Sequence, residues 1–368
     1  MFHAGRENLT ETEQFWNDWI SLLKTKNGDT ESRLLKEAVL YHEGINGLVK
    51  IANDNYMVHP SLYMEIMNEY DKNHGYSQIE KIGENAIEKI DSKMTIRSKI
   101  ALKAAYASSY LNHTEKAMLF CWESFRSDST VRNLLRLFGT REMAERYGMR
   151  AKEVLTSRIK GTPAASIRNS ELNQNIISDY IYNELNFYTG NFEAVKAVSK
   201  NPSGSLGWSS CFVGEGICLF LLYLFEDAIP SKAAAAVANS IGFSDKSVQD
   251  EEIEFEKKII DESNRNKTSI FWNYFQRWKQ YFSMEADEKK QYLTWAEKIV
   301  HSRAEAIVGG QHRRQYGDVA VLLAMIAEIK EQMGEKGMRQ EIFAIYKRKF
   351  TRHSSFQAEM KNYFGIRG

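Results

Sequence analysis

The apolar residues of this chain recur at the spacing of an α-helix along most of its length. Over residues 96–111, apolar or small side chains return every three or four positions, as they do on the buried face of an amphipathic helix. A short turn at 112–114 follows, and the same spacing resumes over 117–125. Two such stretches joined by a short turn predict an antiparallel helical hairpin.

This hairpin pattern returns at residues 178–200 and 316–350. The turns expected there are Thr189-Gly190-Asn191 and Met333-Gly334-Glu335. Small residues and a glycine-containing turn at a helical hairpin are typical of tetratricopeptide repeats of about 34 residues. Paired strand patterns joined by hairpin turns are not found in the sequence. We therefore predict an all-α fold of stacked antiparallel helical hairpins that form a TPR-like α-solenoid.

The helical pattern is interrupted near the middle by a stretch rich in glycine and serine. We expect an N-terminal helical-repeat half over 1–200, a Gly/Ser-rich connection over 201–216 and a C-terminal helical-repeat half over 217–368 with a basic C-terminal segment. In the second half, the aromatic residues of 270–282 surround most of a predicted helix. That pattern indicates either deep burial or an unusually adhesive surface.

Composition limits the partners and the cell compartment. Lysine and arginine number 49 against 48 aspartates and glutamates, so the whole chain has no field that favours nucleic acid or an anionic membrane. The longest apolar run, 217–225, is too short to cross a bilayer and predicts a buried helix. Three cysteines without close spacing and an N-terminus without a signal-peptide pattern predict a cytoplasmic protein that makes no membrane contact.

The chemistry-bearing residues do not form a catalytic, cofactor or metal motif. The glycines of 204–216 lack the preceding strand and the Gly-Lys-Ser/Thr sequence of a phosphate-binding loop. His301 and Glu305, with His312 beyond them, have a spacing that a metal could use, but a pair four residues apart more often makes a contact along one helix face. No nucleophile elbow is present. We expect no enzyme activity, no metal and no cofactor.

Positive charge is concentrated near the C-terminus. From residue 339 onward, two acidic residues, Glu341 and Glu359, oppose seven basic ones: Arg339, Lys347, Arg348, Lys349, Arg352, Lys361 and Arg367. Together with the interleaved residues His353, Phe350, Phe356, Tyr363 and Phe364, these cations could contact a nucleic acid, through its phosphates and by stacking on its bases. We favour the simpler interpretation that a terminal repeat helix needs a polar outer face.

The most specific stretch of sequence runs from Arg303 to Tyr316. We expect Ala304 and Ile307 to pack inward on one helix and Gly309 and Gly310 to end that helix. Arg314 and Asp318, four apart on the next helix, could pair, with a contribution of at most a few tenths of a kcal/mol. The polar residues of the turn form a possible recognition loop. The candidate binding residues are therefore Gln311, His312, Arg313 and Arg314, together with Lys347, Arg348, Lys349 and Arg352.

Two segments carry a resemblance to a known family. The first runs from Arg303 to Arg314 with Tyr316, and continues from Tyr346 to Phe356. The second is Ser124-Phe125-Arg126-Ser127-Asp128-Ser129-Thr130, which leads into Asn133-Leu134-Leu135-Arg136-Leu137. They resemble the helical region of bacterial proteins that carry a SWIM zinc finger, and the resemblance implies a tetratricopeptide-type scaffold. A SWIM finger needs Cys-x-Cys and Cys-x-His, and no Cys-x-Cys occurs here, so no zinc-ligand or DNA-binding residue is carried over.

These features predict an interaction protein. Stacked hairpins form a surface that can bind a peptide or protein partner without catalysis. The alternative is a nucleic-acid-associated accessory protein that uses the basic C-terminal segment.

Overall fold

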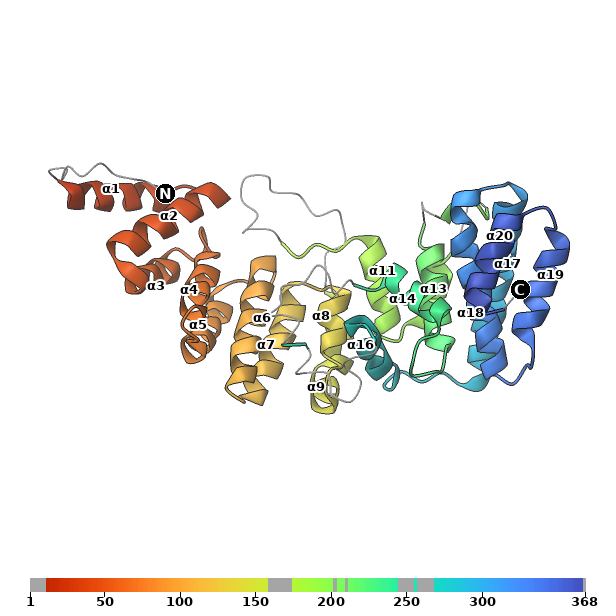
Figure 1. Cartoon of the computed structure of the whole chain (residues 1–368). Helices are drawn as coiled ribbons and strands as arrows, with labels where there is room; N and C mark the ends of the chain where they lie inside the picture. The colour runs from red at the N-terminus through yellow and green to blue at the C-terminus, as the bar shows by residue number, and fades with distance from the viewer. Residues whose placement is uncertain are drawn as a thin grey trace. The chain divides into compact units, whose positions relative to one another are not determined.

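The regular structure of the described residues is helical. The computed structural model describes residues 11–157, 174–200, 204–208, 211–243, 255–256 and 268–366 (Figure 1). In these ranges there is no strand, and Met94 and Gln174 form an isolated antiparallel bridge. The prediction of an all-α protein is confirmed.

The chain divides into two compact units. The first comprises Met1–Leu137 and Glu153–Asp179, and the second comprises Phe138–Lys152 and Tyr180–Gly368. Part of the connection expected at 201–216 lies outside the described residues. The division into two repeat halves that was placed there stays a prediction.

In the first unit, each helix packs on the next one along the chain. The helices are α1 (Thr12–Lys24), α2 (Asp29–His42), α3 (Gly44–Asp54), α4 (Leu62–Asp71), α5 (Tyr76–Lys89), α6 (Thr95–Tyr110), α7 (Thr114–Ser127) and α8 (Val131–Arg136). In addition, α2 packs on α4 and α4 packs on α6. Figure 1 shows α5, α6 and α7 side by side.

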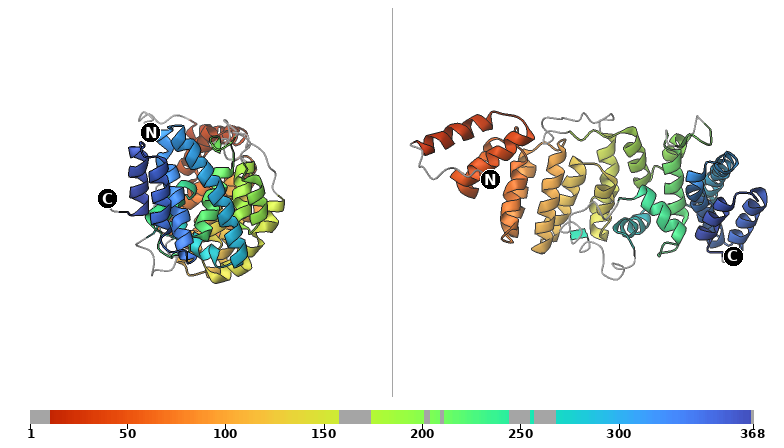
Figure 2. Two further views of the ribbon diagram at one scale, coloured as in Figure 1. Left: turned by 90° about the vertical axis from the view of Figure 1, so that its right-hand side faces the viewer. Right: turned by 45° about the horizontal axis from the view of Figure 1, so that its top comes forward.

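The second unit is built around one buried helix. Its helices are α9 (Arg141–Arg146), α11 (Asp179–Tyr188), α12 (Phe192–Val198), α13 (Val213–Leu224), α14 (Lys232–Ile241), α16 (Ile270–Lys279), α17 (Ala286–Gly309), α18 (Tyr316–Gln332), α19 (Met338–Lys349) and α20 (Ser354–Phe364). Helix α18 packs on α13, α14, α17, α19 and α20. The blue helices α17 to α20 lie together in both views of Figure 2.

The three predicted hairpins are present. They are α6 with α7, α11 with α12, and α18 with α19, and their turns fall where the sequence predicts them. Helix α6 packs on α7 and α18 packs on α19, while α11 and the short α12 meet through the rings of Phe187 and Phe192. The apolar run 217–225 lies in α13 and at its C-terminal end, and most of its side chains are buried. Among the described residues, no helix has the length and apolar character that crossing a membrane requires.

The three predicted turns share one hydrogen-bonding geometry. At the end of α18, the N–H of Gly334 donates to the carbonyl of Glu331 and the N–H of Glu335 donates to that of Lys330. Gly334 has a φ of 99°, so this is a Schellman motif. The same pair of bonds occurs around Gly190 and Asn112, which confirms both turns.

Aromatic side chains fill the core of the second unit around α16. Trp272, Tyr274, Phe275 and Trp278 are buried to 2% exposure or less. The Trp278 ring contacts Phe187, Tyr188, Tyr223, Phe275 and Phe282 at centroid distances of 5.0–6.0 Å. Of the two interpretations of 270–282, deep burial is correct.

Polar side chains hold the α6–α7 hairpin of the first unit together. Arg97 and Glu123 form an ion pair of 2.7 Å with side chains 6% and 9% exposed. Ser98 and Ser124 lie 2.8 Å apart, and the Asn133 amide donates to Ser98. The segment 124–130, which carries the second part of the family resemblance, therefore contributes to a buried structural network.

Candidate functional site

The turns between the last helices gather the candidate binding residues at one end of the second unit. His301 of α17 bonds Tyr346 of α19 at 2.6 Å, so the C-terminal parts of these two helices lie together. The rings of Tyr316 and Phe356, at the starts of α18 and α20, are 5.5 Å apart. The turns 310–315 and 350–353 therefore lie at the same end of the α17–α20 group, which we call the basic end.

The turn after α17 is a Schellman motif without glycine at its left-handed position. Gln311 has a φ of 55°, and its N–H donates to Val308 while that of His312 donates to Ile307. Helix α17 ends at Gly309 and is capped by Gly310, as predicted. A Cβ atom at Gly310 would come within 2.8 Å of the backbone carbonyl oxygen of Ala306, so this close approach requires glycine.

The residues before this turn have structural roles. Ala304 and Ile307 are fully buried, as predicted. The Arg303 guanidinium donates to the carbonyls of Ser205 and Leu206 at 2.7 Å each and lies 5.0 Å from the centre of the Trp208 ring. Arg303 therefore fixes the segment 204–208, and burial lowers its pKa.

The cations of the basic end are exposed, and most of them have no ion-pair partner. Lys349 pairs with Glu305 at 2.5 Å. Within the described part of the chain, no ion pair is formed by Arg313, Arg314, Lys347, Arg348 or Arg352. Arg314 and Asp318 do not form an ion pair with each other. Asp318 interacts electrostatically with Arg303 instead.

The aromatic residues of the basic end point into the core. Phe350 is 8% exposed and Phe356 is fully buried, so neither ring is available to stack on a base. Beneath the turn, the Tyr316 hydroxyl and the His353 Nδ1 atom are buried and have no hydrogen-bond partner among the described residues. The basic end thus combines exposed cations with two buried polar atoms whose hydrogen-bonding capacity is unused.

A second cluster in the same unit was not predicted. Tyr180, Glu184 and Tyr188 lie one helical turn apart on α11, and Glu215 and Cys218 lie on one face of α13. The Tyr180 hydroxyl donates to Glu215 at 2.7 Å. The only sequence signal was the Tyr-x3-Glu-x3-Tyr spacing, because nothing local shows that α11 faces α13. We call Tyr180, Glu184, Tyr188, Glu215 and Cys218 the acidic cluster.

Burial governs the protonation of the acidic cluster. Desolvation, followed by the charge of Glu215, raises the pKa of Glu184 to about 8. Desolvation raises the pKa of Glu215 to about 7, although the hydrogen bond from Tyr180 acts in the opposite direction. Desolvation and the charge of Glu215 also raise the pKa of the Cys218 thiol to about 12. Groups with shifted pKa values are frequent at functional sites.

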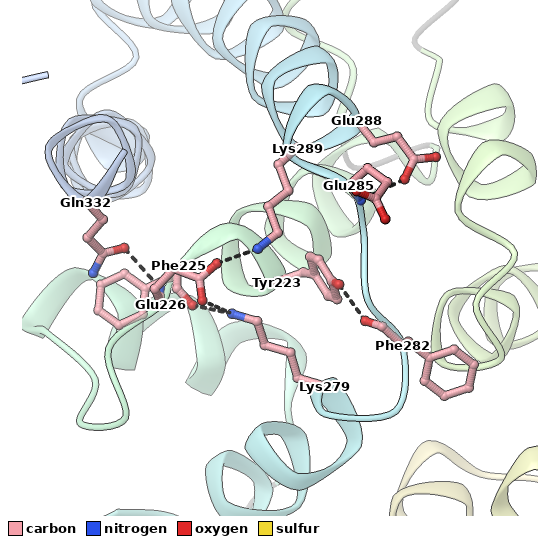
Figure 3. Close-up of polar contacts among 9 residues, drawn as sticks. All are labelled: Tyr223, Phe225, Glu226, Lys279, Phe282, Glu285, Glu288, Lys289 and Gln332. Carbon is pink, nitrogen blue, oxygen red and sulfur yellow. Dashed lines mark hydrogen bonds and ion pairs between the residues drawn. The ribbon is translucent and has the colours of Figure 1, made fainter. Parts of the chain in front are cut away.

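A third polar cluster, around Glu226, is fully paired (Figure 3). Lys289 and Lys279 contact its carboxylate at 2.8 and 3.5 Å, and its backbone N–H donates to Gln332 at 2.9 Å. Desolvation alone would raise the pKa of Glu226, but the two lysines lower it. This cluster joins the ends of α13, α16 and α18 and the start of α17, which is a structural role.

The donors of the described residues do not assemble a metal site. In these residues, no three histidine, cysteine, aspartate or glutamate side chains are grouped so that they could hold an ion. Comparisons with protein-family models, curated proteins and solved structures found no match to this chain.

Proposed function

We propose that this chain is a non-enzymatic helical-repeat scaffold whose basic end binds an acidic segment of a protein or peptide partner. The packing of consecutive helices, with α2 on α4 and α4 on α6, supports the repeat arrangement. The resemblance to the helical region of SWIM-associated proteins is consistent with the same scaffold.

The observation that carries this proposal is the gathering of cations from two turns at one end. Arg313 and Arg314 come from the turn after α17, and Lys347 and Arg352 come from the end of α19 and the turn after it. All four are exposed, and none is neutralised by an ion pair among the described residues. Arginine forms bidentate bonds with carboxylates, so an acidic segment suits this surface.

A nucleic acid is the second candidate, because the same cations could contact phosphates. The burial of Phe350 and Phe356 leaves no exposed phenylalanine ring beside these cations on which a single-stranded base could stack. What remains for a nucleic acid is contact with its backbone, which weakens steeply as salt rises.

The test is a double substitution, Arg313→Ala with Arg314→Ala. Binding of a synthetic peptide rich in aspartate and glutamate, and of a mixed-sequence DNA duplex, is measured on the full chain by fluorescence anisotropy at several salt concentrations. We expect the peptide affinity to fall at least about tenfold, the equivalent of one charge-assisted hydrogen bond or more. The melting temperature should not change, because neither side chain has a partner to lose.

The control is Lys336→Ala, an exposed cation without an ion pair among the described residues, at the α18–α19 turn and so at the opposite end of the same helices. It should leave peptide binding unchanged. Tighter binding of DNA than of peptide, with a steep salt dependence, would replace the proposal with the nucleic-acid candidate. Peptide binding that survives the loss of Arg313 and Arg314 would contradict the role of the basic end.

A further inference from the structure

The two carboxyl groups of the acidic cluster have no cation beside them among the described residues. Within the described residues, Glu184 makes no hydrogen bond or ion pair, and Glu215 has only the Tyr180 hydroxyl as a partner. Glu226, in the same unit, has two lysines. The contrast matters because a half-buried carboxylate without a cation is destabilised when it ionises.

A buried hydroxyl without a partner lies in the same cluster. Tyr188 is fully buried, and its hydroxyl has no hydrogen-bond partner among the described residues. Side chains on a helix lean toward its N-terminus, so Tyr188 leans over the turn that carries Glu184. The charges of both Glu184 and Glu215 act on this hydroxyl and, after desolvation, raise its pKa.

We propose that Glu184 and Glu215 bind the ammonium group of a lysine side chain from a partner, and that Tyr188 positions Glu184 for this contact. A lysine ammonium has three donors and no acceptor, which suits two carboxylates that lack cations. The half-exposed Tyr180 ring adds a face on which a cation can rest. When the ammonium holds Glu184 in its ionised form, the Tyr188 hydroxyl has an acceptor one helical turn away.

In the part of the chain that the structure describes, no cation already fills this role. The groups whose charges act on Glu184, Glu215 and Cys218 are one another, Tyr180 and, beside Cys218, Asp318 of α18. Arg303, the cation on the α17 side, interacts with Asp318 and with the carbonyls of Ser205 and Leu206. The proposal therefore concerns residues separate from the basic end and does not depend on that end binding a partner.

The experiment is isothermal titration calorimetry of the full chain with three probes: a short peptide with a central lysine, the same peptide with that lysine Nε-acetylated, and spermidine. We expect the lysine peptide to bind and the acetylated peptide to bind at least about tenfold more weakly, because acetylation removes the charge. If spermidine binds and the peptide does not, the assignment to a partner's lysine is wrong. If acetylation does not change the affinity for the peptide, the proposal of an ammonium-binding site is wrong.

Variants separate the roles of the residues. Glu184→Gln should lower the affinity for the lysine peptide at least about tenfold, while Glu341→Gln, an exposed carboxylate on α19, should leave it unchanged. Tyr188→Phe should lower it about fivefold, the equivalent of one hydrogen bond, without loss of thermal stability. If Glu184→Gln binds as tightly as the unmodified chain, the proposal fails.

The pH profile provides a readout that a purely structural role would not move. Because the free carboxylates have pKa values of about 8 and about 7 and the bound state needs them ionised, affinity should rise from about pH 6 to about pH 8. Lysine stays protonated over this range. In Glu184→Gln and in Tyr188→Phe the rise should be smaller. A profile that is flat in the unmodified chain would contradict the site.

Discussion

The two units hold similar helical hairpins together by different means. In the first unit, the α6–α7 hairpin relies on the buried Arg97–Glu123 ion pair and on Ser98, Ser124 and Asn133. In the second unit, α11 and α12 pack near a cluster of aromatic rings centred on Trp278. A buried polar network fixes partners through directional bonds, whereas an aromatic core contributes mainly buried area. We therefore expect the two units to respond differently to the loss of one side chain.

The largest effect is expected from Trp278→Ala. Trp278 is fully buried, contacts five aromatic rings and donates to the carbonyl of Tyr188 at 2.7 Å. Removing it should destabilise the second unit by about 3–5 kcal/mol, because a large cavity forms in a packed core. Urea unfolding followed by circular dichroism measures this loss, with the exposed Ile229→Ala as control. A loss no greater than that of the control would show that the aromatic cluster does not hold the unit.

Breaking the polar network comes next. Glu123→Gln leaves the Arg97 guanidinium buried without its counter-ion and should destabilise the first unit by on the order of 3 kcal/mol. The control is Glu69→Gln, which breaks the ion pair between Lys72 and Glu69. This pair is more exposed than Arg97–Glu123, so its loss should change stability by less than about 0.5 kcal/mol. Hydrogen exchange measured on peptides from α6 and α7 assigns the effect to this unit. Equal effects of the two substitutions would remove the distinction between the units.

The smallest expected effect concerns a feature that both units share. His74 in the first unit and Gln311 in the second take the left-handed conformation that glycine occupies at 190 and 334. Gln311→Gly should therefore stabilise the chain by about 1 kcal/mol, and Gly334→Ala should destabilise it by a similar amount. Thermal melting of both variants checks the signs. A destabilised Gln311→Gly would mean that the Gln311 side chain contributes contacts worth more than the strain.

Sequence patterns were enough for the helices and for some of their ends. The turns at Asn112, Gly190 and Gly334 were visible because asparagine and glycine tolerate a positive φ. At the end of α17 the sequence showed the stop at Gly309 and Gly310 but not the left-handed residue Gln311, because glutamine does not favour a positive φ. The spacing of apolar residues also could not decide whether the helix over 270–282 is buried or exposed. Aromatic rings on most sides of a helix are compatible with either environment.

Of the candidate sites, one could be predicted from the sequence and the other could not. The basic residues near the C-terminus were visible as an excess of charge, and short turns between long helices bring their two segments to one end. The acidic cluster was not visible, because Glu184 and Glu215 meet only through the packing of α11 beside α13. Their shifted pKa values come from burial, which local sequence does not encode. The interleaved aromatic residues were misleading for a related reason, since Phe350 and Phe356 form the core beneath the charges.

The contact made by Arg303 has a consequence for how the protein folds as it is synthesised. Its guanidinium holds the carbonyls of Ser205 and Leu206, which precede it by 98 and 97 residues. At about 5–20 residues per second, a ribosome needs roughly 5–20 s to add that much chain. Residues 204–208 therefore leave the ribosome long before the side chain that fixes them. Until α17 has been made, the carbonyls of Ser205 and Leu206 lack the Arg303 donor in the growing chain.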